Sequence, residues 1–178
     1  MNRRIYLFIV FLYSLSLPLS SQTAEDSTAI VTARWETTVA PNGMVHKRAA
    51  ISHLYKGNQS INLVEIPAGG DFRYDIAVSQ MTPISQLAQE HQALAAINGS
   101  FYNMQKGNSV CYLKIGKEVV DTTTSREFKL RVTGAVHVYK KKLRVLPWSP
   151  EIEAKYRKNK GTVLASGPLL LDDGKTCS

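Results

Sequence analysis

The helical period of one segment, and its scarcity elsewhere, most constrains the fold of this chain. Apolar residues recur at helical spacing from Ile84 to Leu94, and Thr82-Pro83 is typical of a helix start. Elsewhere, short segments rich in β-branched and aromatic residues alternate with Gly, Pro and Asn turns. One strong helix among many strands argues against a doubly wound sheet. The sequence therefore predicts an α+β fold, a curved and mostly antiparallel mixed sheet with one principal helix, residues 82–94, packed on it.

The predicted strands lie on both sides of this helix. Before it they cover residues 29–35, 49–54, 61–66 and 74–78. After it they cover residues 109–115, 118–120, 130–139, 143–146, 162–165 and 169–171, with a short helix over residues 151–158. Gly116-Lys117 and Lys140-Lys141-Lys142 are predicted hairpin turns.

The N-terminal segment has the layout of a secretory signal peptide. Arg3 and Arg4 precede an apolar run over residues 5–17, and small residues follow near Ser21. The run is shorter than the ~20 apolar residues of a membrane-spanning helix, and an uncleaved anchor is the alternative. The sequence predicts a signal peptide over residues 1–21, a secreted or periplasmic protein of bacterial type with no stable membrane span after cleavage, and one domain over residues 22–178.

The charge balance is basic. The 22 basic and 14 acidic residues give +8, and removal of Arg3 and Arg4 leaves +6. Two late clusters, residues 140–142 and 155–160, hold much of the excess. Such runs are usually solvated turns or helix faces, and the alternative is attraction to anionic partners such as phosphate-bearing glycans or acidic polymers. No nucleic-acid-binding motif appears, and export also argues against a nucleic-acid partner.

Cysteine and histidine give no metal motif. Cys111 and Cys177 are the two cysteines; they could form one disulfide in an oxidising compartment, but the sequence does not give their separation. His46, His53, His91 and His137 are scattered, so we expect neither a metal nor a cofactor. Because His91 lies beside the apolar stripe of the predicted helix, it is interpreted as a core or boundary histidine rather than a catalytic one.

The strongest candidate functional motif is Asn-Gly-Ser-Phe-Tyr-Asn, residues 98–103. An Asn-Gly pair after an apolar run favours a tight turn, because Gly99 tolerates positive φ and Asn98 tolerates it better than most residues. The turn presents amides, a hydroxyl and two aromatic rings in succession. Such neutral hydrogen-bonding groups beside aromatic faces suit a sugar better than a metal. The alternative is a hairpin turn whose aromatic rings pack into a core.

Together with Ala-Ser-Gly-Pro-Leu-Leu-Leu-Asp-Asp-Gly-Lys at residues 165–175, this motif resembles the phosphodiester glycosidase family. That family comprises the domain of the mannose 6-phosphate uncovering enzyme, N-acetylglucosamine-1-phosphodiester alpha-N-acetylglucosaminidase, and its bacterial relatives. The likeness runs from about Ile30 to Lys175. It implies a secreted hydrolase that cleaves a sugar-1-phosphodiester to a free sugar and a phosphomonoester.

The resemblance also implies roles for individual residues. Asn98 would bind substrate or position an oxyanion, and Gly99 would allow close backbone approach. The aromatic pair would shape the sugar pocket, and Gly167 would place a backbone N–H near the phosphate. The implied substrate-binding set is Asn98, Gly99, Ser100, Phe101, Tyr102, Ser166 and Gly167.

This chain departs from the family pattern after the Gly-Pro strand. Family members continue with Pro-Arg-Thr and Asp-Gly-Arg segments that supply charged groups, and neither segment is present here. We therefore expect a domain that is incomplete at its C-terminal end. The alternative function is a catalytically inactive carbohydrate- or envelope-binding module, and a third is an exported structural protein.

The sequence gives only weak candidates for catalytic carboxylates. Sugar transfer usually uses two carboxyl groups. Asp71 and Asp75 are the weak catalytic candidates, and an exposed turn aspartate is the simpler interpretation of Asp71. Arg73 and Tyr74 could help to hold a phosphate or could be a solvated strand start. The carboxylates outside obvious surface runs are Glu65, Asp71, Asp75 and Asp121.

Overall fold

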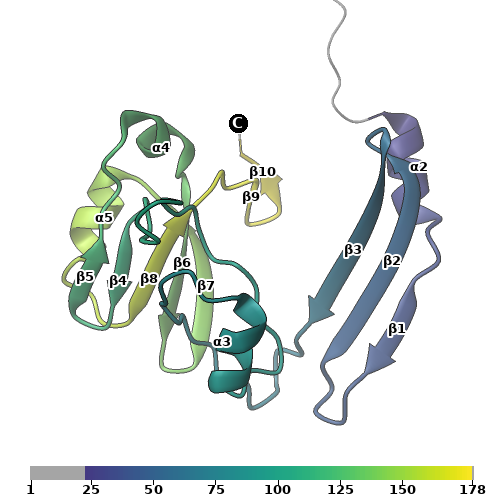
Figure 1. Cartoon of the computed structure of the whole chain (residues 1–178), viewed down its shortest axis with the longest axis horizontal. Helices are drawn as coiled ribbons and strands as arrows, with labels where there is room; N and C mark the ends of the chain where they lie inside the picture. Colours follow the sequence, from purple (N-terminus) through teal and green to yellow (C-terminus); the bar gives the residue numbers. More distant parts are fainter. Residues whose placement is uncertain (1–22, 178) are drawn as a thin grey trace, which may run out of the picture. The chain divides into compact units, whose positions relative to one another are not determined.

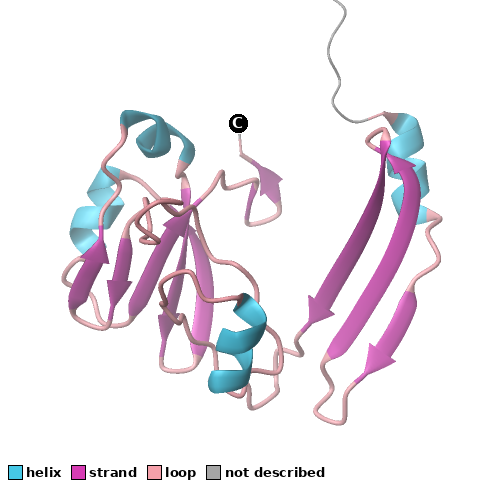
Figure 2. Cartoon of the chain, viewed as in Figure 1, coloured by secondary structure: helices cyan, strands magenta, loops and turns pink. Residues whose placement is uncertain are grey.

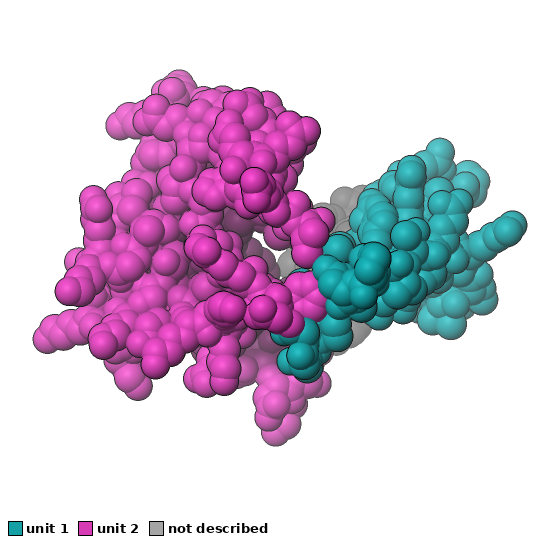
Figure 3. Space-filling model, turned by 90° about the horizontal axis from the view of Figure 1, so that it is seen from below, with its two compact units in different colours: residues 1–70 teal, residues 71–178 magenta. Residues whose placement is uncertain are grey.

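The structure is a computed structural model that describes residues 23–177 (Figure 1). The signal peptide predicted over residues 1–21 lies outside them. The described chain combines helices with antiparallel sheets, which confirms the α+β class (Figure 2). It divides after Gly70 into two compact units, whereas the sequence predicts one domain (Figure 3). The division follows the Pro-Ala-Gly-Gly segment at residues 67–70, and each unit has its own buried cluster.

The first unit is a three-stranded antiparallel sheet in the order β1-β2-β3, with helix α2 alongside it (Figure 1). Ala49, Ile51 and Leu54 of β2 are buried, and Ala29 and Ile30 of α2 pack against them. The elements are α2 (Ala24–Val31), β1 (Glu36–Val39), β2 (Val45–Leu54) and β3 (Gly57–Glu65).

The prediction of a strand over residues 29–35 is wrong, because residues 29–31 form the last part of α2. The helix begins with a capping box, in which the Thr23 hydroxyl accepts from the N–H of Asp26 and the Asp26 carboxylate accepts from the N–H of Thr23. This reciprocal pair satisfies two N–H groups at the helix start and outweighs the β preference of Ile30 and Val31.

Asp26 also joins α2 to the β2–β3 hairpin. Its carboxylate accepts hydrogen bonds from the backbone N–H of Thr23 at 2.9 Å and from that of Tyr55 at 2.8 Å. These bonds, the Thr23 backbone bond first among them, hold the pKa of Asp26 below its ordinary value. The ionised carboxylate therefore stabilises the folded first unit.

We expect acid to destabilise the first unit through Asp26. Because the folded-state pKa lies below the ordinary value of 3.8, the contribution is complete above that value and is lost as the pH falls through it toward the folded-state pKa. Asp26→Asn should lower the melting temperature at neutral pH and flatten this acid limb. The measurement is thermal unfolding followed by Trp35 fluorescence in a Trp148→Phe background. An acid limb of unchanged steepness in Asp26→Asn would contradict this assignment.

The second unit contains a five-stranded antiparallel sheet in the order β5-β4-β8-β6-β7, and a small β9–β10 hairpin. Tyr112, Trp148 and Val163 lie in its core, against which α5 packs through Ile152 and Tyr156. The strands are β4 (Leu113–Ile115), β5 (Glu118–Asp121), β6 (Gly134–Tyr139), β7 (Lys142–Pro147), β8 (Thr162–Ser166), β9 (Leu171–Asp172) and β10 (Lys175–Thr176). The helices are α3 (Ile84–Glu90), α4 (Arg126–Arg131) and α5 (Pro150–Tyr156).

The predicted principal helix is shorter than residues 82–94. Helix α3 has seven residues, none of them buried, and α2 is longer at eight residues. Gln92 takes a left-handed φ of 50°, which ends the helical path before Leu94. His91 is the exposed C-cap residue rather than a core residue.

Four strand predictions in the second unit are wrong wholly or in part: residues 74–78, 109–115, 130–139 and 169–171. Strand β4 begins only at Leu113 and β9 only at Leu171. Residues 74–78 form no strand. Residues 130–139 begin in α4, because the Ser125 hydroxyl caps that helix at the N–H of Phe128, and the strand β6 starts only at Gly134. The predicted hairpin turn at Gly116-Lys117 does connect β4 to β5. The turn predicted over Lys140-Lys141-Lys142 connects β6 to β7 through Lys140 and Lys141, because Lys142 is the first residue of β7.

Candidate functional site

The Asn98–Asn103 motif lies against the last residues of β8. The Ser100 hydroxyl donates a hydrogen bond of 2.9 Å to the carbonyl of Ala165. A Cβ on Gly99 would come within 2.5 Å of Cδ2 of Leu164. Gly99 does not take the left-handed φ that the sequence predicts, so close packing rather than turn geometry requires the glycine. The structure thus brings the motif beside the strand end that leads into Ser166 and Gly167.

The two aromatic residues of the motif have different surroundings. The ring of Phe101 packs on that of Phe128 in α4, with 5.3 Å between the ring centroids. Tyr102 forms an isolated β-bridge with Ser109, and Tyr102 is 54% exposed. Asn98 is exposed as well. Tyr102 and Asn98 are therefore accessible to a ligand, whereas Phe101, also exposed, anchors the motif to a helix as well.

Gly167 is packed against the connection between α4 and β6. A Cβ at this position would lie 2.4 Å from the carbonyl oxygen of Arg131 and 2.8 Å from the backbone nitrogen of Thr133. The Thr133 hydroxyl accepts a hydrogen bond of 2.9 Å from the N–H of Leu169, which fixes the chain just after the bend. The bend beside the motif is therefore held by backbone contacts that only a glycine permits.

The weak catalytic candidates Asp71 and Asp75 lie in exposed ion pairs. Asp71 contacts the ammonium group of Lys141 at 3.0 Å, and Asp75 contacts Arg73 at 3.0 Å. Lys141 lies in the β6–β7 turn, which adjoins the Thr162 end of β8. Ser166 is at the other end of that strand, ~13 Å away at ~3.3 Å per residue. The structure does not bring Asp71 to the motif.

The other candidates named from the sequence include Glu65, Arg73 and Tyr74. Glu65 belongs to the first unit, where it pairs with Lys47. Arg73 forms an ion pair with the Asp75 carboxylate and so is not a free cation for a phosphate. Tyr74 lies between these two residues along the chain.

Asp121 is the candidate carboxylate that the sheet register brings toward the motif. Leu113 of β4 pairs with Asp121 on one side and with Leu164 on the other. The β4–β5 register shifts between Leu113 and Lys114, so this pairing brings Asp121 beside β4 without fixing the face to which its side chain points. Leu164 is the residue that Gly99 approaches. With strands ~4.8 Å apart, Asp121 lies about 10 Å from Leu164 across β4.

Asn108 holds the Asp121 carboxylate. The Nδ2 group of its side-chain amide donates a 3.0 Å hydrogen bond to Oδ1 of Asp121. The oxygen of the same amide, Oδ1 of Asn108, is buried without a hydrogen-bond partner among the described residues. Because this oxygen is buried, the contribution of Asn108 to the site is the orientation of Asp121. The sequence gives no local signal for this pair, because thirteen positions separate the two residues.

Cys111 lies buried beneath the motif. The Ser100 hydroxyl and the Phe101 backbone contact its thiol, but burial is the larger effect and raises the pKa of Cys111. A buried thiol of raised pKa is a poor nucleophile. Cys177 is exposed, and the structure leaves both cysteines free. Cys111 therefore serves as packing for the motif.

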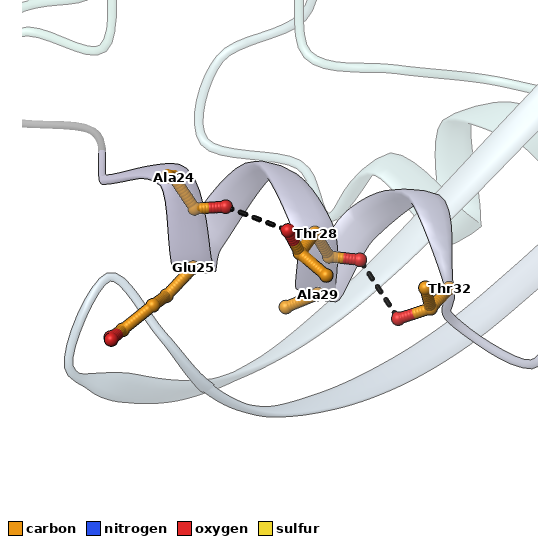
Figure 4. A pocket seen from close by; sticks show the side chains of 5 residues that line it. All are labelled: Ala24, Glu25, Thr28, Ala29 and Thr32. Carbon is orange, nitrogen blue, oxygen red and sulfur yellow. Dashed lines mark hydrogen bonds between the residues drawn. The ribbon is translucent and has the colours of Figure 1, made fainter.

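A hollow of about 430 Å³ lies on the first unit, along one side of α2 (Figure 4). The Thr28 and Thr32 hydroxyls at its edge donate to carbonyls of their own helix, at 2.9 and 2.8 Å. Glu25 is the remaining charged group in its lining. Because its lining comes from a single helix face, the hollow does not gather groups from several elements as a binding site does.

Within residues 23–177 no group of three or more His, Cys, Asp and Glu side chains could hold a metal ion. None of the helices described there has the length and hydrophobicity to cross a membrane. No family model, curated protein or solved structure matches the chain.

Proposed function

We propose that the chain is an exported hydrolase of the phosphodiester glycosidase type, whose residues 98–102 and 166–167 bind a sugar-1-phosphodiester. The supporting observation is the hydrogen bond from Ser100 to the carbonyl of Ala165, which fastens the two candidate segments side by side. Tyr102 offers an exposed ring for a sugar face, and Asn98 offers an amide for sugar hydroxyls. The backbone at Gly167 would meet the phosphate oxygens.

In this proposal Asp121 replaces Asp71 and Asp75 as the group that transfers a proton. Cleavage of the sugar–phosphate bond needs a side chain that protonates the leaving oxygen or activates water. Asp121 pairs with Leu113, whose other neighbour Leu164 lies beside the motif, and the Asn108 amide fixes the orientation of Asp121.

A binding module without catalysis is the second candidate function. It is favoured by the arrangement of carboxylates, since Asp71 and Asp75 are neutralised in exposed ion pairs and Asp121 is the one candidate left beside the motif. Glycoside hydrolysis usually uses two carboxyl groups. The two candidate functions share the sugar-binding surface and differ in turnover.

We expect the purified chain to release free sugar from a methyl phosphodiester of N-acetylglucosamine 1-phosphate. Asp121→Asn should lower turnover by about 100-fold, as loss of a general acid or base does, with binding retained. Asn98→Ala should weaken binding by about tenfold, the loss of one or two hydrogen bonds. Free sugar is measured by chromatography and binding by calorimetry.

The matched control is Glu118→Gln, which removes a carboxylate from the exposed start of the same strand and should leave turnover within about twofold. Binding without turnover would select the binding module. Absence of both would contradict both candidates and leave an exported structural protein.

A further inference from the structure

Three loops bring lysines to one end of the five-stranded sheet. The pairs Lys114–Val163 and Val138–Thr162 place the β4–β5 turn, the β6–β7 turn and the loop before β8 at the same end, the lower end in Figure 1. The two basic clusters at residues 140–142 and 155–160 therefore meet in space. We call the following group the lysine end: Lys117, Lys140, Lys141, Lys142, Lys158 and Lys160.

Buried polar contacts hold the backbone of these loops in place. The ammonium group of Lys114, which is 0% exposed, donates to the carbonyls of Gly116 and Asn159 at 2.7 Å and of Gly161 at 3.0 Å. This side chain ties the β4–β5 turn to the loop before β8. The His137 ring donates through Nε2 to the carbonyl of Lys160 at 2.9 Å and ties the same loop to β6. The lysine end is therefore a preformed surface from which the side chains project.

The charge of this surface is largely uncompensated. Lys141 pairs with Asp71, and the other five lysines form no ion pair with any residue of the described chain. All six residues are exposed. Lys140 also lies over the ring of Tyr139, with its ammonium nitrogen 5.5 Å from the ring centroid. Like charges held close together on one surface attract anions and repel one another.

We propose that the lysine end binds a linear acidic polysaccharide through several of its anionic groups at once. The surface spans the sheet from β5 to β7, about 19 Å at ~4.8 Å per strand, which exceeds a single small anion. Lysines are flexible point charges, which suit repeated carboxylate or sulfate groups better than one phosphate in fixed geometry.

A polysaccharide fits this surface better than single-stranded nucleic acid does. Proteins that bind single strands stack successive bases on a row of aromatic rings, and Tyr139 is the aromatic residue in contact with a lysine here. The lysine end is also distinct from the proposed sugar-phosphodiester surface, because Thr162 and Ser166 mark opposite ends of β8. The two surfaces can be tested separately.

The experiment measures fluorescence anisotropy of labelled polygalacturonate with the full chain, with neutral dextran and a thymidine oligonucleotide as comparison probes. We expect polygalacturonate binding that weakens by about tenfold or more between 50 and 200 mM salt, as polyanion binding does, and no dextran binding. The variant Lys117→Gln/Lys142→Gln/Lys160→Gln removes one cation from the β4–β5 turn, one from the first residue of β7 and one from the loop before β8. It should weaken binding by about tenfold or more.

The matched control removes the same charge elsewhere, with Arg126→Gln/Lys129→Gln/Lys175→Gln. Arg126 and Lys129 are on α4, which connects the opposite end of the sheet. This variant should bind within about twofold of the parent chain. Unchanged melting temperatures verify the fold of both variants, since all six positions are exposed. Equal weakening by both triple variants, tighter binding of the oligonucleotide than of polygalacturonate at equal charge, or no polyanion binding would each overturn the proposal.

Discussion

Lys114→Met is expected to lower the free energy of unfolding of the second unit by about 3 kcal/mol or more. The methionine keeps the length and apolar character of the lysine stem but removes the ammonium group. Three carbonyl oxygens, those of Gly116, Asn159 and Gly161, then lose their donor. Hydrogen bonds to a charged group contribute about 1.5–3 kcal/mol each. Burial lowers the pKa of Lys114, but the three carbonyl acceptors favour its charged form and make the site a good one for an ammonium group.

The measurement is urea unfolding followed by the fluorescence of Trp148 in a Trp35→Phe background, because Trp148 is buried in the core of the second unit. Lys117→Met is the control. It changes an exposed lysine in the adjoining β4–β5 turn and should cost no more than about 0.5 kcal/mol. If the Lys114 and Lys117 variants are equally stable, the loops do not depend on the buried ammonium group.

The local pattern of the sequence predicts most of the sheet. The hairpin turns at Gly116-Lys117 and Lys140-Lys141 are where the structure has them. The errors arise where a polar side chain decides locally, as at the Thr23 and Ser125 caps. Lys114 shows that contacts between distant parts of the chain also escape prediction from local sequence. Two of its acceptors lie 45 and 47 positions away along the chain, so no local pattern could reveal that this lysine is buried.

The candidate site shows the same division between local and long-range information. The motif at residues 98–103 could be selected from residue types alone, and the structure places it beside the strand end before Gly167. The choice among carboxylates could not be made in this way. Asp121 comes near the motif through the β5-β4-β8 register, which joins the β4–β5 hairpin to β8, a strand far away along the chain. Asp71 follows two glycines, a position that favours an exposed turn. Its ion pair with Lys141 places it toward the other end of β8.

Gly167→Ala is expected to destabilise the second unit by about 3 kcal/mol, at the upper end of the usual cost of overpacking. The added Cβ would meet three backbone atoms, the oxygen of Arg131 at 2.4 Å, the nitrogen of Thr133 at 2.8 Å and Cα of Val132 at 3.1 Å. Because these atoms belong to the connection between α4 and β6, the clash can be relieved only by moving that connection. The measurement is again urea unfolding followed by Trp148 fluorescence.

Gly99→Ala provides the comparison on the opposite side of the candidate site. Its Cβ would also come close to a neighbour, Cδ2 of Leu164 at 2.5 Å, but this atom ends a flexible side chain that can rotate away. We expect a cost of about 1 kcal/mol, with a larger effect on sugar binding than on stability. Equal stabilities for the two alanine variants would mean that the Gly167 bend is not confined by backbone. The end of β8, to which Ser100 is hydrogen-bonded at Ala165, would then not be held rigidly by the backbone around Gly167. A preformed sugar-binding surface would then have no structural support.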